Sequence, residues 1–169
     1  HEEYADHPYV KGTFNGLKID IVPCYAVTSA TDLISAVDRT PLHGIYLSNQ
    51  LSEELSTEIR ILKQFFKGCG VYGSDLKTQG VSGYLSELIV ILFGSFENTI
   101  EEMSKWVVPV RLDLNGPSEH FFESPLTFID PIDSSRNVAA ALSPANLSRI
   151  QHYSRELLSR PRIELFYPL

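Results

Sequence analysis

The chain has 169 residues, of which 43% are hydrophobic and 21% are charged, a composition typical of a soluble globular protein of one domain or slightly more. Its formal net charge is −7, whereas a domain that binds nucleic acid by itself is usually basic, so we expect other regions to hold most of any RNA partner. The two cysteines and the lack of a signal peptide or long apolar run exclude a disulfide framework and a membrane protein, and they indicate a cytoplasmic compartment.

The first predicted elements are two strands, residues 9–14 and 17–22, which are joined by Asn15 and Gly16. An Asn-Gly pair between two such runs is the strongest short-range signal of a β-hairpin. The sequence therefore predicts an antiparallel pair near the start of the chain.

Asp20 is a lone carboxylate in the middle of the second strand, where aspartate is depleted. Successive strand residues point to opposite faces, so Asp20 lies opposite Ile19 and Ile21, which we expect to be buried. The pattern alone leaves open whether Asp20 belongs to an ordinary solvated face or has a function.

Residues 28–40 are predicted to form a polar connection with a short helical segment at 33–37. Thr40 and Pro41 then predict a helix start, with Thr40 as the N-cap and Pro41 at the first helical position. His43 falls in the first turn of that helix, where it is either an exposed polar residue or a donor to a phosphate.

Residues 53–96 are the centre of the predicted organisation, because they read as two helices joined by a glycine-rich loop. The second helix, 84–93, is apolar on nearly every face, which is typical of a central helix covered by its neighbours. The first helix carries apolar residues at helical spacing, and these are Leu55, Ile59, Leu62, Phe65 and Phe66.

The loop between these helices, residues 68–83, contains five of the ten glycines of the chain. A helix start near Ser82 would present backbone N–H groups and a positive dipole end, an arrangement that favours anions. The same pattern is equally compatible with a long surface loop and ordinary helix caps.

Gly94 and Ser95 predict a helix break followed by a new cap, and further elements continue to the end of the chain. These are short strands within 107–114 and 126–129, a small-residue helix at 136–142, and a longer helix from Ser143 that is ended by Pro161, with Leu147, Ile150, Leu157 and Leu158 facing inward. The chain lacks an initiator methionine and ends in the apolar run 163–169, so we expect it to be a segment of a longer polypeptide.

Nine short segments, taken together and in order, resemble the archaeal-type (class I) CCA-adding enzymes, which are tRNA nucleotidyltransferases. Each segment is weak by itself, whereas the ordered set is specific and spans nearly the whole chain. The segments are HPYV (7–10), IDIVPCY (19–25), AVDRTPLH (36–43), RILKQFFK (60–67), VYG (71–73), GVSGYLSEL (80–88), FGSF (93–96), IDPID (129–133) and RNVAA (136–140).

The resemblance implies an α+β fold in two parts. Residues 1–27 would be the last strands of a nucleotidyltransferase palm sheet in the catalytic head. Residues 28–169 would be a mainly helical central domain with a few short strands, similar to that of poly(A) polymerases and oligoadenylate synthases. The parent protein would add CCA to the tRNA 3′ end from CTP and ATP with Mg²⁺, and the resemblance leaves a homodimer open.

By the same resemblance, Asp20 matches the third catalytic carboxylate of the family, which binds the Mg²⁺ that activates the RNA 3′-hydroxyl. Seven residues match the nucleotide site: His43, Lys63 and Tyr72 at the triphosphate, Ser82 and Tyr84 at the anion-binding helix start, and Arg136 and Asn137 near the base. Asn137 is also compatible with a helix cap.

The chain departs from the family in one respect, because it contains no D-x-D carboxylate pair after a Gly-Ser motif. Two-metal phosphoryl transfer needs several carboxylates, so we expect the parent to be an enzyme and this piece alone to be inactive. Two alternatives stay open: a non-catalytic nucleotide- or protein-binding module of the same superfamily, and a helical interaction domain with a coincidental loop.

Overall fold

The computed structural model describes residues 2–4 and 8–168, and the chain divides into two compact units, His1–Asn49 and Gln50–Leu169. Each unit combines helical segments with one small sheet in the described ranges, so the α+β class is confirmed. The domain boundary that the resemblance implies, at residue 27, stays a prediction.

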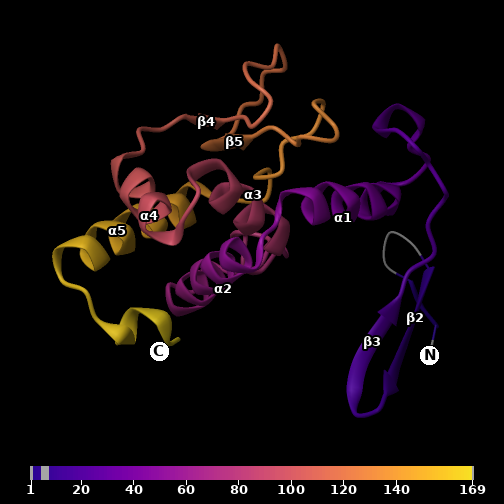
Figure 1. Ribbon diagram of the computed structural model, residues 1–169, viewed down its shortest axis with the longest axis horizontal. Helices are drawn as coiled ribbons and strands as arrows, with labels where there is room; N and C mark the ends of the chain where they lie inside the picture. The colour runs from indigo at the N-terminus through magenta and orange to yellow at the C-terminus, as the bar shows by residue number, and fades with distance from the viewer. Residues whose placement is uncertain (1, 5–7, 169) are drawn as a thin grey trace. The chain divides into compact units, whose positions relative to one another are not determined.

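The first unit contains an antiparallel sheet of three strands in the order β1-β2-β3, with bounds Glu2–Tyr4, Pro8–Phe14 and Leu17–Ile21 (Figure 1). The two residues between β2 and β3 have positive φ angles, 49° at Asn15 and 80° at Gly16. Positive φ at both central positions is the signature of a type I′ turn, whose twist matches that of the strands. The predicted hairpin is confirmed.

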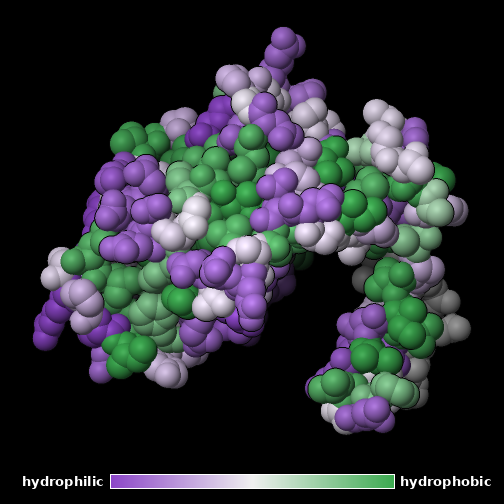
Figure 2. Space-filling model, in the orientation of Figure 1, coloured by the Kyte–Doolittle hydropathy of each residue, from purple (hydrophilic) through white to green (hydrophobic). Residues whose placement is uncertain are grey.

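One face of this hairpin is apolar and the other is polar. The register pairs Val10 with Ile21 and Phe14 with Leu17 on the apolar face. Ile21 is 60% exposed and Ile19 is 39% exposed, and every residue of β3 is open to solvent. The prediction that Ile19 and Ile21 are buried is therefore wrong for this chain, because no described element of the unit covers the face on which they lie; green atoms on the hairpin mark hydrophobic residues in Figure 2.

Three helical segments follow the sheet: 3-10 turns at Ala30–Asp32 and Ala36–Asp38, and helix α1 at Arg39–Gln50. The short helical segment predicted at 33–37 is only partly correct, because Leu33 is extended and the second 3-10 turn begins at Ala36. The predicted N-cap at Thr40 is wrong, since the second turn continues directly into α1 and places Thr40 inside the helix.

Asp38 explains why the chain turns here, because its buried carboxylate accepts several hydrogen bonds. The donors are the backbone N–H groups of Tyr25 (2.8 Å), Ile34 (3.0 Å) and Ser35 (2.6 Å) and the Ser35 hydroxyl (2.8 Å). Burial by itself raises the pKa of Asp38, but these hydrogen bonds outweigh it and hold the pKa at about 2, below the ordinary value of 3.8.

The depressed pKa of Asp38 predicts a pH-dependent stability. Its contribution is fully present above the ordinary pKa of 3.8 and is lost as the pH falls through about 2. We therefore expect Asp38→Asn to lower the thermal midpoint at neutral pH, and the gap between variant and wild type to shrink as the pH falls below the ordinary pKa. The exposed Asp32 serves as the control, since Asp32→Asn should shift the midpoint little at any pH; a constant gap for Asp38→Asn would contradict the prediction.

The second unit is mainly helical, with a two-stranded parallel sheet at one side (Figure 1). Its helices pack α2 on α3, α3 on α4 and α4 on α5, and the final 3-10 turn η3 packs on α2. The bounds are α2 Glu53–Gly68, α3 Gly83–Phe93, α4 Phe96–Lys105, β4 Val110–Leu112, β5 Leu126–Phe128, α5 Pro144–Ser159 and η3 Ile163–Phe166. No helix within the described ranges is long and apolar enough to cross a bilayer.

The core of this unit follows the predicted pattern. Helix α3 is central, as predicted, and α2 buries a stripe that ends in Phe65 and Phe66. In α5 the buried stripe runs through Leu147 and Ile150, also as predicted, and reaches the half-buried Leu157. Leu158 is 45% exposed, and the prediction that it faces inward is wrong because one residue further along turns the helix by about 100° away from the stripe.

Residues 136–142 form turns, so the predicted small-residue helix is wrong. Asn137 forms a bridge with Ile129, next to β5, and its side chain bonds to backbone groups there. An asparagine that takes backbone partners in this way draws the chain out of helical conformation. The strand predicted within 107–114 is shorter than expected, because Pro109 lacks an N–H and β4 begins after it.

Candidate functional site

The glycine-rich loop between α2 and α3 is a fixed structure. The Val81 N–H donates to Val71 O at 2.8 Å, and the Gly73 N–H donates to Val81 O at 2.8 Å, so Tyr72 and Val81 form a parallel bridge. A β-carbon on Gly80 would lie only 1.9 Å from Val71 O, which explains why this position is glycine. These contacts hold Tyr72 beside the start of α3.

The N-terminus of α3 lies where the sequence predicted it, with Ser82 as its N-cap. The Ser82 hydroxyl accepts the Leu85 N–H at 3.1 Å, so the side chain is a cap while the helix directs its positive end toward the loop. A β-carbon on Gly83 would lie 3.3 Å from the Tyr72 hydroxyl and 3.8 Å from Lys63 Nζ. The structure thus brings Lys63, Tyr72 and Ser82 together at one helix end.

Two further charged residues belong to this cluster. Lys63 Nζ lies 2.6 Å from Glu87 Oε1, and the two side chains are only 24% and 21% exposed. Lys67 Nζ lies 5.3 Å from the centre of the Tyr72 ring, within the range of a cation–π contact. Two lysines and a helix N-terminus around Tyr72 make a positive site suited to an anion.

A chain of polar contacts leads from α3 to Arg136. The Tyr84 hydroxyl donates to Asp130 Oδ1 at 3.3 Å, and Arg136 Nη1 donates to Asp130 Oδ2 at 2.7 Å. The Asp130 side chain is fully buried, whereas Arg136 is 37% exposed. Asp130 therefore fixes the guanidinium and leaves part of its donor edge accessible to a ligand.

Asn137 has a structural environment. Its amide accepts the Phe128 N–H (2.9 Å) and the Ala139 N–H (2.9 Å) and donates to Leu126 O (3.1 Å). These bonds tie the 136–139 turn to β5. The base contact that the resemblance implies would therefore have to use the second N–H of the Asn137 amide.

Asp20 and His43 lie in the first unit. Asp20 is exposed on β3, directly opposite Lys11 in the register of the hairpin. His43 is half-buried in α1. The described residues contain no group of three or more histidine, cysteine, aspartate or glutamate side chains that could hold a metal ion. A carboxylate oxygen suits Mg²⁺, so Asp20 fits as one ligand of such an ion, but the described residues do not supply a complete set.

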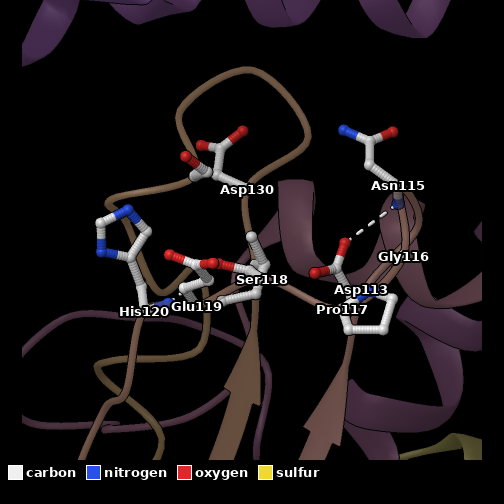
Figure 3. A pocket seen from close by; sticks show the side chains of 10 residues that line it. Asp113, Asn115, Gly116, Pro117, Ser118, Glu119, His120 and Asp130 are labelled. Carbon is white, nitrogen blue, oxygen red and sulfur yellow. Dashed lines mark hydrogen bonds between the residues drawn. The ribbon is translucent and has the colours of Figure 1, made fainter.

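A pocket of about 350 Å³ lies on the loop after β4, where it borders Asp130. Figure 3 shows the carboxylates of Asp113, Glu119 and Asp130 around it. Asp113 Oδ1 accepts the Asn115 N–H at 2.9 Å, while its Oδ2 is buried without a hydrogen-bond partner in the described part of the chain. Three carboxylates repel an anion, so this pocket is less suited to one than the N-terminus of α3.

Sequence reasoning identified the residues at the N-terminus of α3 but missed their partners. Glu87 had no signal in the sequence beyond its place four residues after Gly83, which puts the two on one helix face. Asp130 stood out in the sequence only as part of the segment IDPID (129–133), and nothing local showed that its carboxylate is buried against Arg136.

Comparison with known proteins identifies the family. Residues 57–167 match the tRNA nucleotidyltransferase second domain. The chain is 53% identical over 169 residues to the CCA-adding enzyme of Halorubrum lacusprofundi, which covers 100% of the chain and 37% of that protein. It is 46% identical over 165 residues to the CCA-adding enzyme of Saccharolobus islandicus, covering 98% of the chain and 40% of that protein. The chain thus spans well under half the length of these curated relatives, and it belongs to the tRNA nucleotidyltransferase family.

Proposed function

We propose that this chain is part of an archaeal-type CCA-adding enzyme, which adds C, C and A to the tRNA 3′ end from CTP and ATP. The names of the relatives and the whole-chain similarity support this activity for the parent protein. The first unit would carry the last strands of the catalytic palm, with Asp20 as a ligand of Mg²⁺. The ion would activate the RNA 3′-hydroxyl, and the other ligands would come from elsewhere in the parent.

The observation that carries the proposal is the convergence of Lys63 and the Tyr72 hydroxyl over Gly83 at the positive end of α3. A triphosphate is a dense anion, and helix N-termini, lysines and hydroxyl donors are the groups that bind it. Because Gly83 has no side chain, the Tyr72 hydroxyl and the Lys63 ammonium can approach this helix end, 3.3 Å and 3.8 Å from the β-carbon position. We assign Lys63, Tyr72, Ser82 and Tyr84 to the phosphates. For His43, in the first unit, the triphosphate contact rests on the family resemblance alone.

Arg136 is assigned to the base of the nucleotide, with Asn137 as a second polar neighbour. The buried Asp130 holds one guanidinium nitrogen and leaves other donors of Arg136 available. A guanidinium fixed in this way can read the acceptor edge of a base, which is the kind of contact that discriminates between nucleotides.

Two substitutions in the full-length parent test these assignments. Lys63→Ala removes a charged phosphate contact, so we expect KM for both CTP and ATP to rise about tenfold or more. Arg136→Ala removes a base contact, so it should lower the selectivity for CTP and ATP over UTP and GTP more than Lys63→Ala does. Both variants are measured by steady-state kinetics with all four nucleotides.

The exposed Lys77 of the glycine-rich loop supplies a matched control, because Lys77→Ala removes the same charge from a side chain that is not among those nearest Gly83, and it should leave KM nearly unchanged. An unchanged KM for both nucleotides in Lys63→Ala would refute the phosphate assignment. An equal loss for all four nucleotides in Arg136→Ala would mean that Arg136 only holds the Asp130 turn.

A further inference from the structure

We propose that Glu87 is a positioning residue of the nucleotide site, which acts through Lys63. The inference rests on the proposed function, because it assumes that Lys63 binds phosphate. Glu87 would hold the Lys63 ammonium in its binding position at the N-terminus of α3 before the nucleotide arrives.

The geometry places Glu87 directly behind the phosphate-binding surface. It lies four residues after Gly83, so the two residues share one face of α3, one turn apart. Lys63 reaches this face from α2 and lies between them, 2.6 Å from Glu87 Oε1 and 3.8 Å from the β-carbon position of Gly83. Glu87 therefore meets Lys63 from the side away from the helix end.

The charges at this helix end explain why Lys63 needs a counter-ion. A lysine beside the positive end of a helix is disfavoured, and Lys67 adds a second positive charge on the Tyr72 ring. The Lys63–Glu87 pair is more than three-quarters buried, so salt screens it less than it screens a surface pair. Glu87 offsets the repulsion while no phosphate is bound.

The side chains of Lys63 and Glu87 bond to each other and, within the described ranges, to no other group. Other polar residues of α2 hold backbone groups instead: Glu58 accepts the Phe96 N–H, and Gln64 donates to Phe166 O. A lysine side chain has large rotamer freedom, and fixing it in advance lowers the entropy lost when a ligand binds. The pair thus orients Lys63 for binding, whereas Glu58 and Gln64 join elements of the fold.

A double-mutant cycle in the full-length parent tests this role. The four proteins are wild type, Glu87→Ala, Lys63→Ala and the double variant, and equilibrium binding of CTP and ATP is measured for each. With Lys63 present, we expect Glu87→Ala to weaken nucleotide binding about fivefold, because Lys63 is then no longer ordered in advance. When Lys63 is already alanine, Glu87→Ala should weaken binding by less than about twofold. Glu87→Gln keeps an acceptor for Lys63 and should fall between wild type and Glu87→Ala.

Two results would overturn the inference. An equal effect of Glu87→Ala in both backgrounds would show that Glu87 acts through the fold, and tighter binding in Glu87→Ala would show that it opposes the phosphate. Thermal midpoints are measured in parallel, with Glu97→Ala on the exposed side of α4 as control. If Glu87→Ala does not fold, Glu87→Gln in both Lys63 backgrounds completes the cycle with the same criteria.

The cycle also separates this inference from the proposed function. If Lys63→Ala itself leaves nucleotide binding unchanged, the phosphate assignment of Lys63 fails. If Lys63→Ala weakens binding and Glu87→Ala has no effect in the wild type, only the role of Glu87 fails.

Discussion

Asp20→Ala in the full-length parent is expected to slow single-turnover addition by about a thousandfold. In the proposed function, Asp20 supplies a carboxylate ligand to Mg²⁺ at the attacking hydroxyl, and losing it should cost several kcal/mol of transition-state stabilisation. Nucleotide affinity should change far less, because the groups assigned to the triphosphate lie on other elements. Single-turnover rates and equilibrium nucleotide binding are measured on the same variant.

The stability of the present chain separates this role from a structural one. Asp20 is exposed on β3, and substitutions at such positions usually change the free energy of unfolding by less than about 0.5 kcal/mol. The thermal midpoint of the chain should therefore stay nearly unchanged in Asp20→Ala. Asp32→Ala, at an exposed aspartate of the same unit, should affect neither rate nor midpoint. A destabilised chain with a nearly normal parental rate would show that Asp20 is a structural carboxylate.

The elements that the sequence predicted well are those with a local physical cause. Asn15 and Gly16 tolerate positive φ, and a hairpin turn requires it. Ser82 and Ser95 cap α3 and α4 through hydrogen bonds to N–H groups three residues ahead. In each case the deciding interaction spans only a few residues, so the amino-acid pattern contains it.

The features that the sequence did not predict depend on contacts between distant residues. The Asp38 carboxylate accepts the N–H of Tyr25, 13 residues earlier, and that network sets the start of α1. The contact between Tyr84 and Asp130 spans 46 residues. The turn at Asn137 formed where apolar composition favoured a helix, because its amide bonds to β5. Hydrophobic periodicity and helix-capping rules consider only residues close in sequence, so they do not predict contacts between distant residues.

The candidate site reflects the same division. The start of α3 and the glycines before it were evident in the sequence, and the structure adds the side chains that lie around them. Lys63 lies on α2, and only the packing of α2 on α3 brings its ammonium to Gly83. Glycine therefore has two different uses in this loop: Gly80 allows close packing of backbone, and Gly83 lets the side chains of Tyr72 and Lys63 approach the helix end.

These two uses predict that substitution by alanine changes the free energy of unfolding by different amounts at the two positions. In Gly80→Ala the new methyl would lie 1.9 Å from Val71 O and 3.0 Å from Gly73 O, and backbone atoms cannot rotate away. The loop must separate from Val71, which breaks the bridge that holds Tyr72. We expect a loss of about 1–3 kcal/mol or more in the free energy of unfolding, measured by denaturant titration of this chain, and weaker nucleotide binding in the parent.

Gly83→Ala is the matched control, because its methyl would meet only the side chains of Tyr72, at 3.3 Å, and Lys63, at 3.8 Å. Both can shift by a few tenths of an ångström, and alanine suits the first turn of a helix, so the free energy of unfolding should change by less than about 0.5 kcal/mol. Nucleotide binding in the parent should still weaken, since the methyl occupies the surface on which the phosphates would rest. Equal stability losses in the two variants, or normal binding in Gly83→Ala, would show that this helix end is packed structure and not the phosphate site.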